Sequence, residues 1–220
     1  MMYTIQDLYD LNHTLAKPLL EQFRYPWEAL SGISDFIKEL GARLPEEEYD
    51  HPEEDIWIAK SAKVAKTASI TGPCIIGKEA DVRHCAFLRG STLIGEKTVV
   101  GNSTELKNVI LFDGVQVPHY NYVGDSILGY KAHMGAGSIT SNVKGDRLLV
   151  VIKNGEEQIE TGRKKVGAML GDFAEIGCGT VLNPGCVIGR GTCVYPLCSV
   201  RGVIPEHSIY KNQSEIVERR

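Results

Sequence analysis

The sequence lacks several features that mark common classes of protein. It has no run of eighteen apolar residues, and its first residues, MMYTIQDLYD, do not form a signal peptide. Its six cysteines include no C-x-x-C pair, which argues against a redox or zinc motif of that kind. A net charge of −4 provides no overall field for nucleic acid or an anionic membrane. These absences predict a cytoplasmic protein with no nucleic-acid or membrane partner.

What the sequence does have is an apolar residue at every sixth position. A period of six does not fit an α-helix, whose inward positions recur every 3.6 residues, but it fits a solenoid of short strands. The pattern predicts a mainly β fold, a left-handed parallel β-helix of hexapeptide repeats over residues 56–204, with three hexads in each triangular coil. The repeated positions are Ile58, Val64, Ile70, Ile76, Val82, Leu88, Ile94, Val100, Leu106 and Phe112, then Leu128 and Met134, then Leu170, Ile176, Leu182, Ile188, Val194 and Val200.

The ends of the chain follow other patterns. Residues 1–43 are predicted to form a short α-helical cap, which begins with a capping box at Thr4 and Asp7 and ends near Gly41. We expect this cap to cover the bare edge of the first coil. Residues 44–55 are acidic and contain two prolines, which favours an exposed linker, and residues 205–220 are predicted to be a C-terminal tail.

The repeat is interrupted in two places. After Phe112 it reaches Pro118 and then slips, so that a polar and aromatic loop interrupts the coils. A second break, at about residues 141–168, reads as a β-hairpin with a type I′ turn at Asn154-Gly155. Insertions in solenoids often form binding surfaces. The basic run at 163–165 is either a solvated strand end or a contact for an anionic ligand.

Two cations occupy a position of the repeat where glycine is usual. Arg89 and Lys107 are eighteen residues apart, so they are expected to stack on adjacent coils about 4.8 Å apart. Stacked cations repel each other unless an anion lies between them. The pair is therefore a candidate phosphate clamp.

A histidine lies inside the first interruption. His119 is flanked by Tyr120, Asn121 and Tyr122. An imidazole that is largely neutral near neutral pH can take a proton from an attacking amine. Most histidines in loops are structural, but this combination makes His119 a candidate general base, with Asn121 as a candidate substrate-binding residue.

These residues lie in motifs that resemble a known family. The span from Arg89 to Val200 is similar to the C-terminal acetyltransferase domain of the bifunctional glucosamine-1-phosphate acetyltransferase/N-acetylglucosamine-1-phosphate uridyltransferase. The matching motifs are Leu88-Arg-Gly90, Val100-Gly-Asn with Glu105-Leu-Lys-Asn108, His119-x-x-Tyr122-x-Gly-Asp125, and Met134-Gly-Ala-Gly-Ser-Ile-Thr-Ser-Asn142. The nucleotidyltransferase domain of that family has no counterpart in this sequence.

The resemblance implies a homotrimer with active sites between subunits, acetyl-CoA as donor and an amino-sugar 1-phosphate as acceptor. It implies no tightly bound metal. Arg89 and Lys107 would hold the sugar phosphate with help from Tyr122. His119 would take the proton from the amine, and Asn142 would orient the substrate or the acetyl group. The backbone around Ala136 would face CoA, and amides within 134–138 would stabilise the oxyanion.

The sequence departs from the family at several positions. His133 replaces an asparagine at the substrate site, and Val143 replaces a tyrosine. Cys178 and Pro196 stand in the CoA groove where the family has serine and a small residue, and the hairpin insertion falls where CoA is expected to enter. The acceptor and the CoA contacts are therefore less well specified than the phosphate end.

Two other functions remain open. A non-catalytic β-helix that binds a sugar phosphate or nucleotide sugar would explain the loss of the family's asparagine and tyrosine. A γ-class carbonic anhydrase would bind zinc through three histidines, but no histidine follows His119 by five residues.

Overall fold

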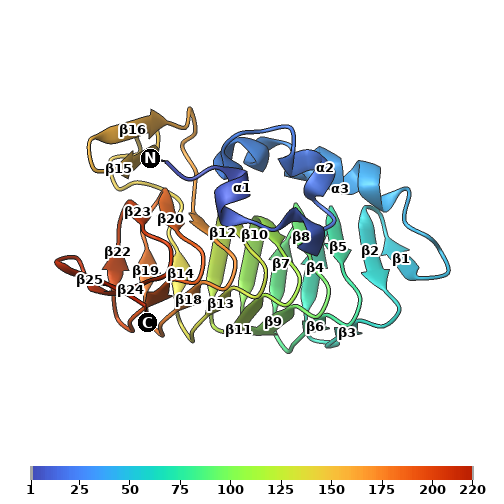
Figure 1. Cartoon of the computed structure of the whole chain (residues 1–220). Coiled ribbons are helices and arrows are strands. Elements are labelled where there is room, and N and C mark those ends of the chain that lie inside the picture. Colours follow the sequence, from blue (N-terminus) through green and yellow to red (C-terminus); the bar gives the residue numbers. More distant parts are fainter. Residues whose placement is uncertain (1, 220) are drawn as a thin grey trace.

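The computed structural model describes residues 2–219 and confirms the predicted parallel β-helix, with a helical segment lying along one side of it (Figure 1). Successive strands of the chain turn through three faces. Face one is a nine-stranded sheet. Its strands are β3 (Lys63–Val64), β6 (Asp81–Val82), β9 (Val99–Asn102), β11 (Gln116–His119), β13 (His133–Met134), β18 (Glu175–Ile176), β21 (Cys193–Val194), β24 (Ser208–Asn212) and β25 (Glu215–Glu218).

A fourteen-stranded sheet forms the other two faces, because β10 and β12 bend from one face onto the next. Face two contains β4 (Ser69–Thr71), β7 (Phe87–Arg89), β14 (Ile139–Thr140), β19 (Val181–Leu182), β22 (Ser199–Val200) and the first halves of β10 (Glu105–Leu111) and β12 (Tyr122–Leu128). Face three contains the second halves of β10 and β12 with β1 (Tyr49–Glu53), β2 (Ile56–Ala59), β5 (Cys74–Ile76), β8 (Thr92–Ile94), β17 (Ala168–Leu170), β20 (Cys186–Ile188) and β23 (Val203–Ile204).

The strand register confirms the stacking of coils but corrects the repeat at one point. Leu88 pairs with Leu106, as a coil of eighteen residues requires. On the next face Ile94 pairs with Leu111, so Phe112 is not in the repeated inward position. The coil is one residue short there, which places the slip before Phe112 rather than after it. Phe112 is still fully buried, because its ring packs against Tyr9 of the helical segment.

The N-terminal helices lie along face three and not over the end of the first coil, which corrects the predicted position of the cap. They are short: α1 (Ile5–Leu8), the 3-10 helix η1 (Leu11–His13), α2 (Lys17–Leu20), the 3-10 helix η2 (Pro26–Ser31) and α3 (Ile33–Gly41). The capping box at Thr4 and Asp7 is present. α3 contacts β5, β8 and β10, while η2 contacts β12 (Figure 1).

The outward side chains of face three explain this position. Each precedes an inward residue and would be exposed on an uncovered face, yet from β2 to β20 all are apolar and no more than 8% exposed. They include Trp57, Ile75, Leu93, Ile110 and Ile127. Burying such a row against the helices removes a large apolar area from water, at about 25 cal/mol per Å².

The open ends of the β-helix are covered by strands in segments that the sequence did not assign to strands. In the acidic segment 44–55, β1 pairs antiparallel with β2, and Tyr49 is buried. In the predicted tail, β24 continues face one beside β21, and β25 folds back antiparallel on β24. Both arrangements protect a sheet edge that would otherwise be unpaired.

The predicted hairpin is present in the second interruption. It consists of β15 (Val151–Asn154) and β16 (Glu157–Glu160), which pair antiparallel around Gly155 and Glu156. Of these two turn residues only Gly155 has a positive φ, +59°, which fits a type II′ turn rather than the predicted type I′.

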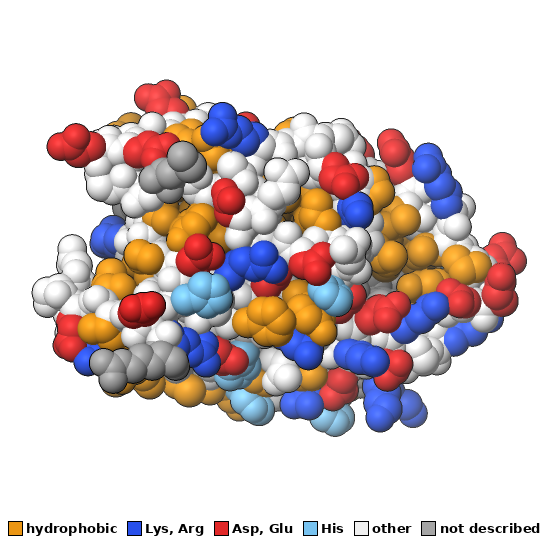
Figure 2. All heavy atoms as spheres, viewed as in Figure 1, with side chains coloured by type: hydrophobic (Ala, Val, Ile, Leu, Met, Phe, Trp, Pro, Cys, Tyr) orange, Lys and Arg blue, Asp and Glu red, His pale blue; other side chains and the backbone are white. Residues whose placement is uncertain are grey.

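The surface carries charges of both signs. Lysine and arginine alternate with aspartate and glutamate over the face shown in Figure 2. Within residues 2–219, no helix is long and apolar enough to span a membrane. All six cysteines are free thiols; Cys74 and Cys186 are buried, whereas Cys178 is exposed.

Candidate functional site

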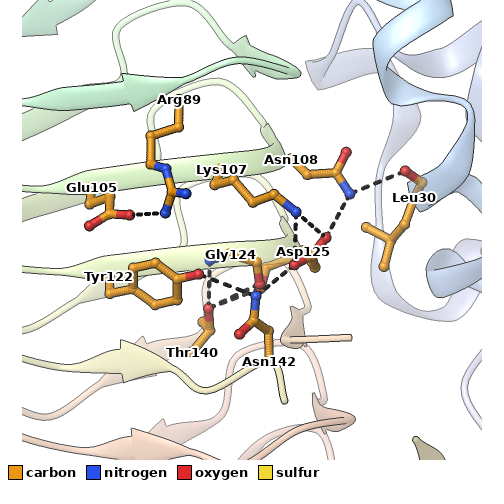
Figure 3. A network of polar contacts seen from close by, with 11 residues as sticks. Leu30, Arg89, Glu105, Lys107, Asn108, Tyr122, Gly124, Asp125, Thr140 and Asn142 are labelled. Atoms are coloured by element: carbon orange, nitrogen blue, oxygen red, sulfur yellow. Dashed lines mark hydrogen bonds and ion pairs between the residues drawn. The ribbon is translucent and has the colours of Figure 1, made fainter. Parts of the chain in front are cut away.

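The two stacked cations lie on adjacent coils of face two, and each is paired with a carboxylate. Arg89 Nη1 donates to Glu105 Oε1 at 2.6 Å, and Lys107 Nζ donates to Asp125 Oδ1 at 3.2 Å (Figure 3). Each cation thus has a negative partner within the chain, so their stacking does not require a bound anion, and the phosphate clamp stays a prediction. The carboxylates fix the direction of both cations.

Asp125 is the centre of a network of polar contacts. It is 2% exposed, and it accepts hydrogen bonds from Lys107 Nζ, from Asn108 Nδ2 at 2.9 Å and from Asn142 Nδ2 at 2.6 Å (Figure 3). Asn108 Nδ2 also donates to the carbonyl oxygen of Leu30 in η2, at 3.2 Å. The network thus joins the predicted phosphate end to the helical segment.

Tyr122 lies beside this network. Its hydroxyl oxygen accepts a hydrogen bond from Asn142 Nδ2 at 3.2 Å. Burial, with a contribution from the charge of Asp125, raises the pKa of Tyr122 above its ordinary value, so the hydroxyl keeps its proton and can donate it in a hydrogen bond. A Cβ at Gly124 would lie 2.5 Å from the Tyr122 hydroxyl and 3.0 Å from Asn142 Nδ2, so a residue without a side chain is needed there.

His119 lies across an edge of the β-helix from Tyr122. We call this the Tyr120 edge, because Tyr120 and the stacked turn residues Ser103, Gly137, Gly179 and Leu197 form it with positive φ. His119 ends β11 on face one, and Tyr122 begins β12 on face two. The His119 side chain is exposed.

The residues predicted to contact CoA form one exposed column with His119. Gly137 N donates to the carbonyl oxygen of His119, Gly179 N to that of Ala136, and Leu197 N to that of Cys178. These bonds place His119, Ala136, Cys178 and Pro196 in equivalent positions of four successive coils, and all four are exposed. We call them the His119 column.

The hairpin does not lie over this column. It rests against Gly185 and Gly202, whose turns are on the edge between faces two and three. Asn108 and Asp125 also have their positive φ angles on that edge, which we call the Asp125 edge. Within one chain the hairpin and the His119 column thus lie on different edges of the β-helix.

Asn121 is buried, and its side chain forms hydrogen bonds to the backbone. It is 2% exposed, its Nδ2 donates to the carbonyl oxygens of Gly135 and Ser138 at 2.9 and 3.0 Å, and its Oδ1 accepts from His119 N at 3.1 Å. These bonds fix the backbone on which the His119 side chain stands. The prediction that Asn121 contacts substrate is therefore wrong.

The amides expected to stabilise an oxyanion are used within the coils. Gly135 N donates to Ile176 O at 2.7 Å, Gly137 N to His119 O at 3.0 Å and Ser138 N to Gly135 O at 3.1 Å. Three of the amides within 134–138 are thus unavailable to a ligand in this arrangement.

His133 lies on face one, apart from the network around Asp125. Its Nδ1 is 2.9 Å from Glu175 Oε2 on the next coil. Both residues line a cleft of about 690 Å³, together with Phe173 and with Tyr130, on which the ring of His13 stacks. Among the residues described, no group of three or more histidines, cysteines or carboxylates is placed to hold a metal ion.

Sequence reasoning missed the residues that orient the predicted site. Glu105, Asn108 and Asp125 belong to the matching motifs, but the sequence alone predicted no role for them in the site. A spacing of eighteen residues after Lys107 points to Asp125, but the strand register pairs Lys107 with Gly124, so Asp125 is a diagonal neighbour that the stacking rule alone does not give.

Comparisons with known proteins agree with the motifs. A family model described as the GMPPB C-terminal domain matches residues 70–154. The chain is 29% identical over 211 residues to the bifunctional protein GlmU of Methanococcus maripaludis, covering 88% of this chain and 47% of that protein. It is 33% identical over 111 residues to the bifunctional sugar-1-phosphate nucleotidylyltransferase/acetyltransferase of Sulfurisphaera tokodaii, covering 50% of this chain and 28% of that protein.

Among solved structures, a putative acetyltransferase of Bacillus cereus is 22% identical with a TM-score of 0.42, covering 74% of this chain and 77% of that one. The chain spans about half the length of the GlmU proteins that it matches over most of its own length. The motifs, the coils and the sequence matches together make the chain similar to the C-terminal half of GlmU-type bifunctional proteins, on a hexapeptide-repeat β-helix fold.

Proposed function

We propose that this chain is an acyl-CoA-dependent N-acyltransferase, with acetyl-CoA as donor and an amino-sugar 1-phosphate or a nucleotide-sugar precursor as acceptor. The observation that carries the proposal is the His119 column. The candidate general base is in line with Ala136, Cys178 and Pro196, the residues proposed to contact the donor. Four successive coils span about 14 Å at 4.8 Å per coil, which is long enough for the extended arm of CoA to lie along the column.

The proposed reaction is direct transfer without an acyl-enzyme. The amine nitrogen of the acceptor attacks the carbonyl carbon of the thioester, and a new C–N bond forms while the C–S bond breaks. His119 takes the proton that the amine loses, and CoA leaves as the thiolate or thiol. Holding amine and thioester beside an exposed imidazole makes the attack effectively intramolecular.

Face two would supply the phosphate end of the acceptor site. Arg89 uses only Nη1 for Glu105, so further guanidinium N–H groups remain to bind a phosphate. Lys107 has three ammonium hydrogens and shares them with the two oxygens of Asp125. The Tyr122 hydroxyl and the Asn142 side chain complete this polar surface. The carboxylates reduce the net charge there, which favours recognition by directed hydrogen bonds over a bare electrostatic attraction.

A homotrimer would complete the site. The His119 column belongs to face one and the Lys107 network to face two, so in one chain the two surfaces lie on either side of the Tyr120 edge and do not face each other. Packing face one of one subunit against face two of the next would bring a general base opposite a phosphate site. His133 and Glu175, also on face one, would then lie near the acceptor.

The proposal is tested by thiol release from acetyl-CoA in the presence of a panel of amino-sugar 1-phosphates. We expect one or more acceptors to release thiol, and His119→Ala to lower turnover by about 10²- to 10⁴-fold. The matched control is His84→Ala, because His84 is also an exposed histidine on face one, two coils before His119.

Unchanged turnover in His119→Ala would remove His119 as the base. A failure of every acceptor, combined with no binding of CoA, would favour the non-catalytic sugar-phosphate-binding function. Sedimentation of the protein at the mass of a monomer under assay conditions would contradict the shared site.

A further inference from the structure

A separate cleft of about 800 Å³ lies between the hairpin and the last coils, at the Asp125 edge. Figure 1 shows the hairpin of β15 and β16 beside β20 and β23. One wall of the cleft comes from Val151 and Lys153 of the hairpin, and the opposite wall from Arg201 and its neighbours in the coil. Residues of the His119 column do not line it.

The walls of this cleft are held firmly together. Val150 and Ile152 at the base of the hairpin are fully buried. A Cβ at Gly185 would lie 2.8 Å from Val150 Cγ1 and 2.9 Å from Ile152 Cδ1, and a Cβ at Gly202 would lie 2.9 Å from the Lys153 carbonyl oxygen. The hairpin thus touches the coil backbone where a side chain would not fit. The cleft is preformed, which lowers the entropic cost of binding.

The charges lining the cleft are mainly positive. Lys153 and Arg201 are both exposed, and neither forms an ion pair with any residue in the 2–219 range that the structure describes. Lys144, a third lining cation, is paired with Asp146 at 3.1 Å. Lys153 and Arg201 thus bring two positive charges without an ion-pair partner to one cleft, and an anion bound there would interact favourably with both.

We propose that this cleft binds the diphosphate group of a nucleotide. Arg201 provides a planar fork for two phosphate oxygens, and Lys153 provides a compact charge on the opposite wall. Val143, which is 41% exposed, with Pro184 and Val203 provides apolar surface for a base or another flat group. The volume is within the range of sites that enclose small ligands. The nucleotide end of CoA and a nucleotide sugar share this chemistry.

The test is calorimetric titration of the full chain with inorganic pyrophosphate, ADP, UDP and CoA. We expect Lys153→Ala/Arg201→Ala to weaken binding of the three nucleotides and of pyrophosphate by at least about 10-fold, since each lost charge-assisted contact is worth about that factor. The control Lys63→Ala/Lys66→Ala removes two exposed lysines from the first coils and should leave all four affinities unchanged. The titrations contain no acyl acceptor, so this result does not depend on acyl transfer.

The four ligands distinguish the sources of the diphosphate. Tighter binding of CoA than of ADP would assign the cleft to the nucleotide end of the donor, and tighter binding of UDP than of either would assign it to a nucleotide sugar. Both outcomes support the proposal. It is overturned if none of the ligands binds the unaltered chain at millimolar concentration, or if Lys63→Ala/Lys66→Ala weakens binding as much as Lys153→Ala/Arg201→Ala.

Discussion

Replacing Asp125 by asparagine should destabilise the protein far more than the removal of one charge at the surface would. The carboxylate is buried, and three donors depend on it: Lys107 Nζ, Asn108 Nδ2 and Asn142 Nδ2. Asparagine is the suitable substitution because it keeps the shape and tolerates the φ of +48° at this position. It removes the negative charge and half of the acceptor capacity.

The expected cost follows from the surroundings of each group. Breaking a buried ion pair by removing one partner costs about 3–5 kcal/mol. Lys107 is 30% exposed on its side chain, so water can solvate part of its charge, which places the cost at the low end of that range. We therefore expect Asp125→Asn to lower the free energy of unfolding by about 3 kcal/mol, which corresponds to a drop in Tm of about 6–12 °C for a chain of this size.

Urea denaturation of four proteins measures this effect: the unaltered chain, Asp125→Asn, Lys107→Met and the double variant. If the pair is as described, the double variant is less destabilised than the sum of the single variants by at least about 1 kcal/mol. Asp50→Asn, on the exposed strand β1, should change stability by no more than about 0.5 kcal/mol. A cost below about 1 kcal/mol for Asp125→Asn, or simple additivity, would refute the role given to the network.

Two other perturbations follow from close packing and burial. Gly101→Ala should lower the free energy of unfolding by about 3 kcal/mol or prevent folding, because its Cβ would lie 1.5 Å from the Pro118 carbonyl oxygen. The control Gly145→Ala should be neutral, because a Cβ there has nothing within 4 Å. Equal thermal stability of the two variants would contradict this prediction. Burial raises the pKa of the Cys74 and Cys186 thiols to about 12, above that of a thiol in the unfolded chain. The stability that comes from keeping these thiols protonated is therefore complete below about pH 8.5 and is lost as the pH rises toward 12. Urea unfolding from pH 8 to pH 11 should therefore show a steeper loss of stability than in Cys74→Ala/Cys186→Ala, and parallel curves would exclude this linkage.

The period of six was sufficient to predict the coils, because inward positions in a β-helix depend only on local spacing. It placed Arg89 beside Lys107 and marked the interruption at about residues 141–168, where the Asn154-Gly155 turn predicted the hairpin. It failed at Phe112 because a large apolar residue can be buried on the outside of a coil when another segment covers it. Periodicity reports that a residue is apolar and does not report which neighbour buries it.

The position of the helical segment could have been predicted from a second apolar row. Trp57, Ile75 and Leu93 precede inward residues on one face only, which indicates a face that is not exposed to water. The partners of the candidate site were harder to predict, because the acceptors of Lys107 and Arg89 depend on side-chain directions. Residue spacing brought Asp125 near Lys107, but only the structure shows that one carboxylate serves three donors.

The helical segment also determines how the chain can fold. Glu206 N donates to the Tyr3 hydroxyl near the last coils, and Gly41 packs against Trp57 in the first coil, so the segment connects the two ends of the β-helix. In most solenoids each repeat touches only its neighbours, and unfolding can spread gradually from either end. Here the loss of a coil at either end would also release the segment, which makes unfolding more cooperative. The segment is synthesised before the coils, yet the surface to which it binds exists only once those coils have formed, so its docking follows their formation.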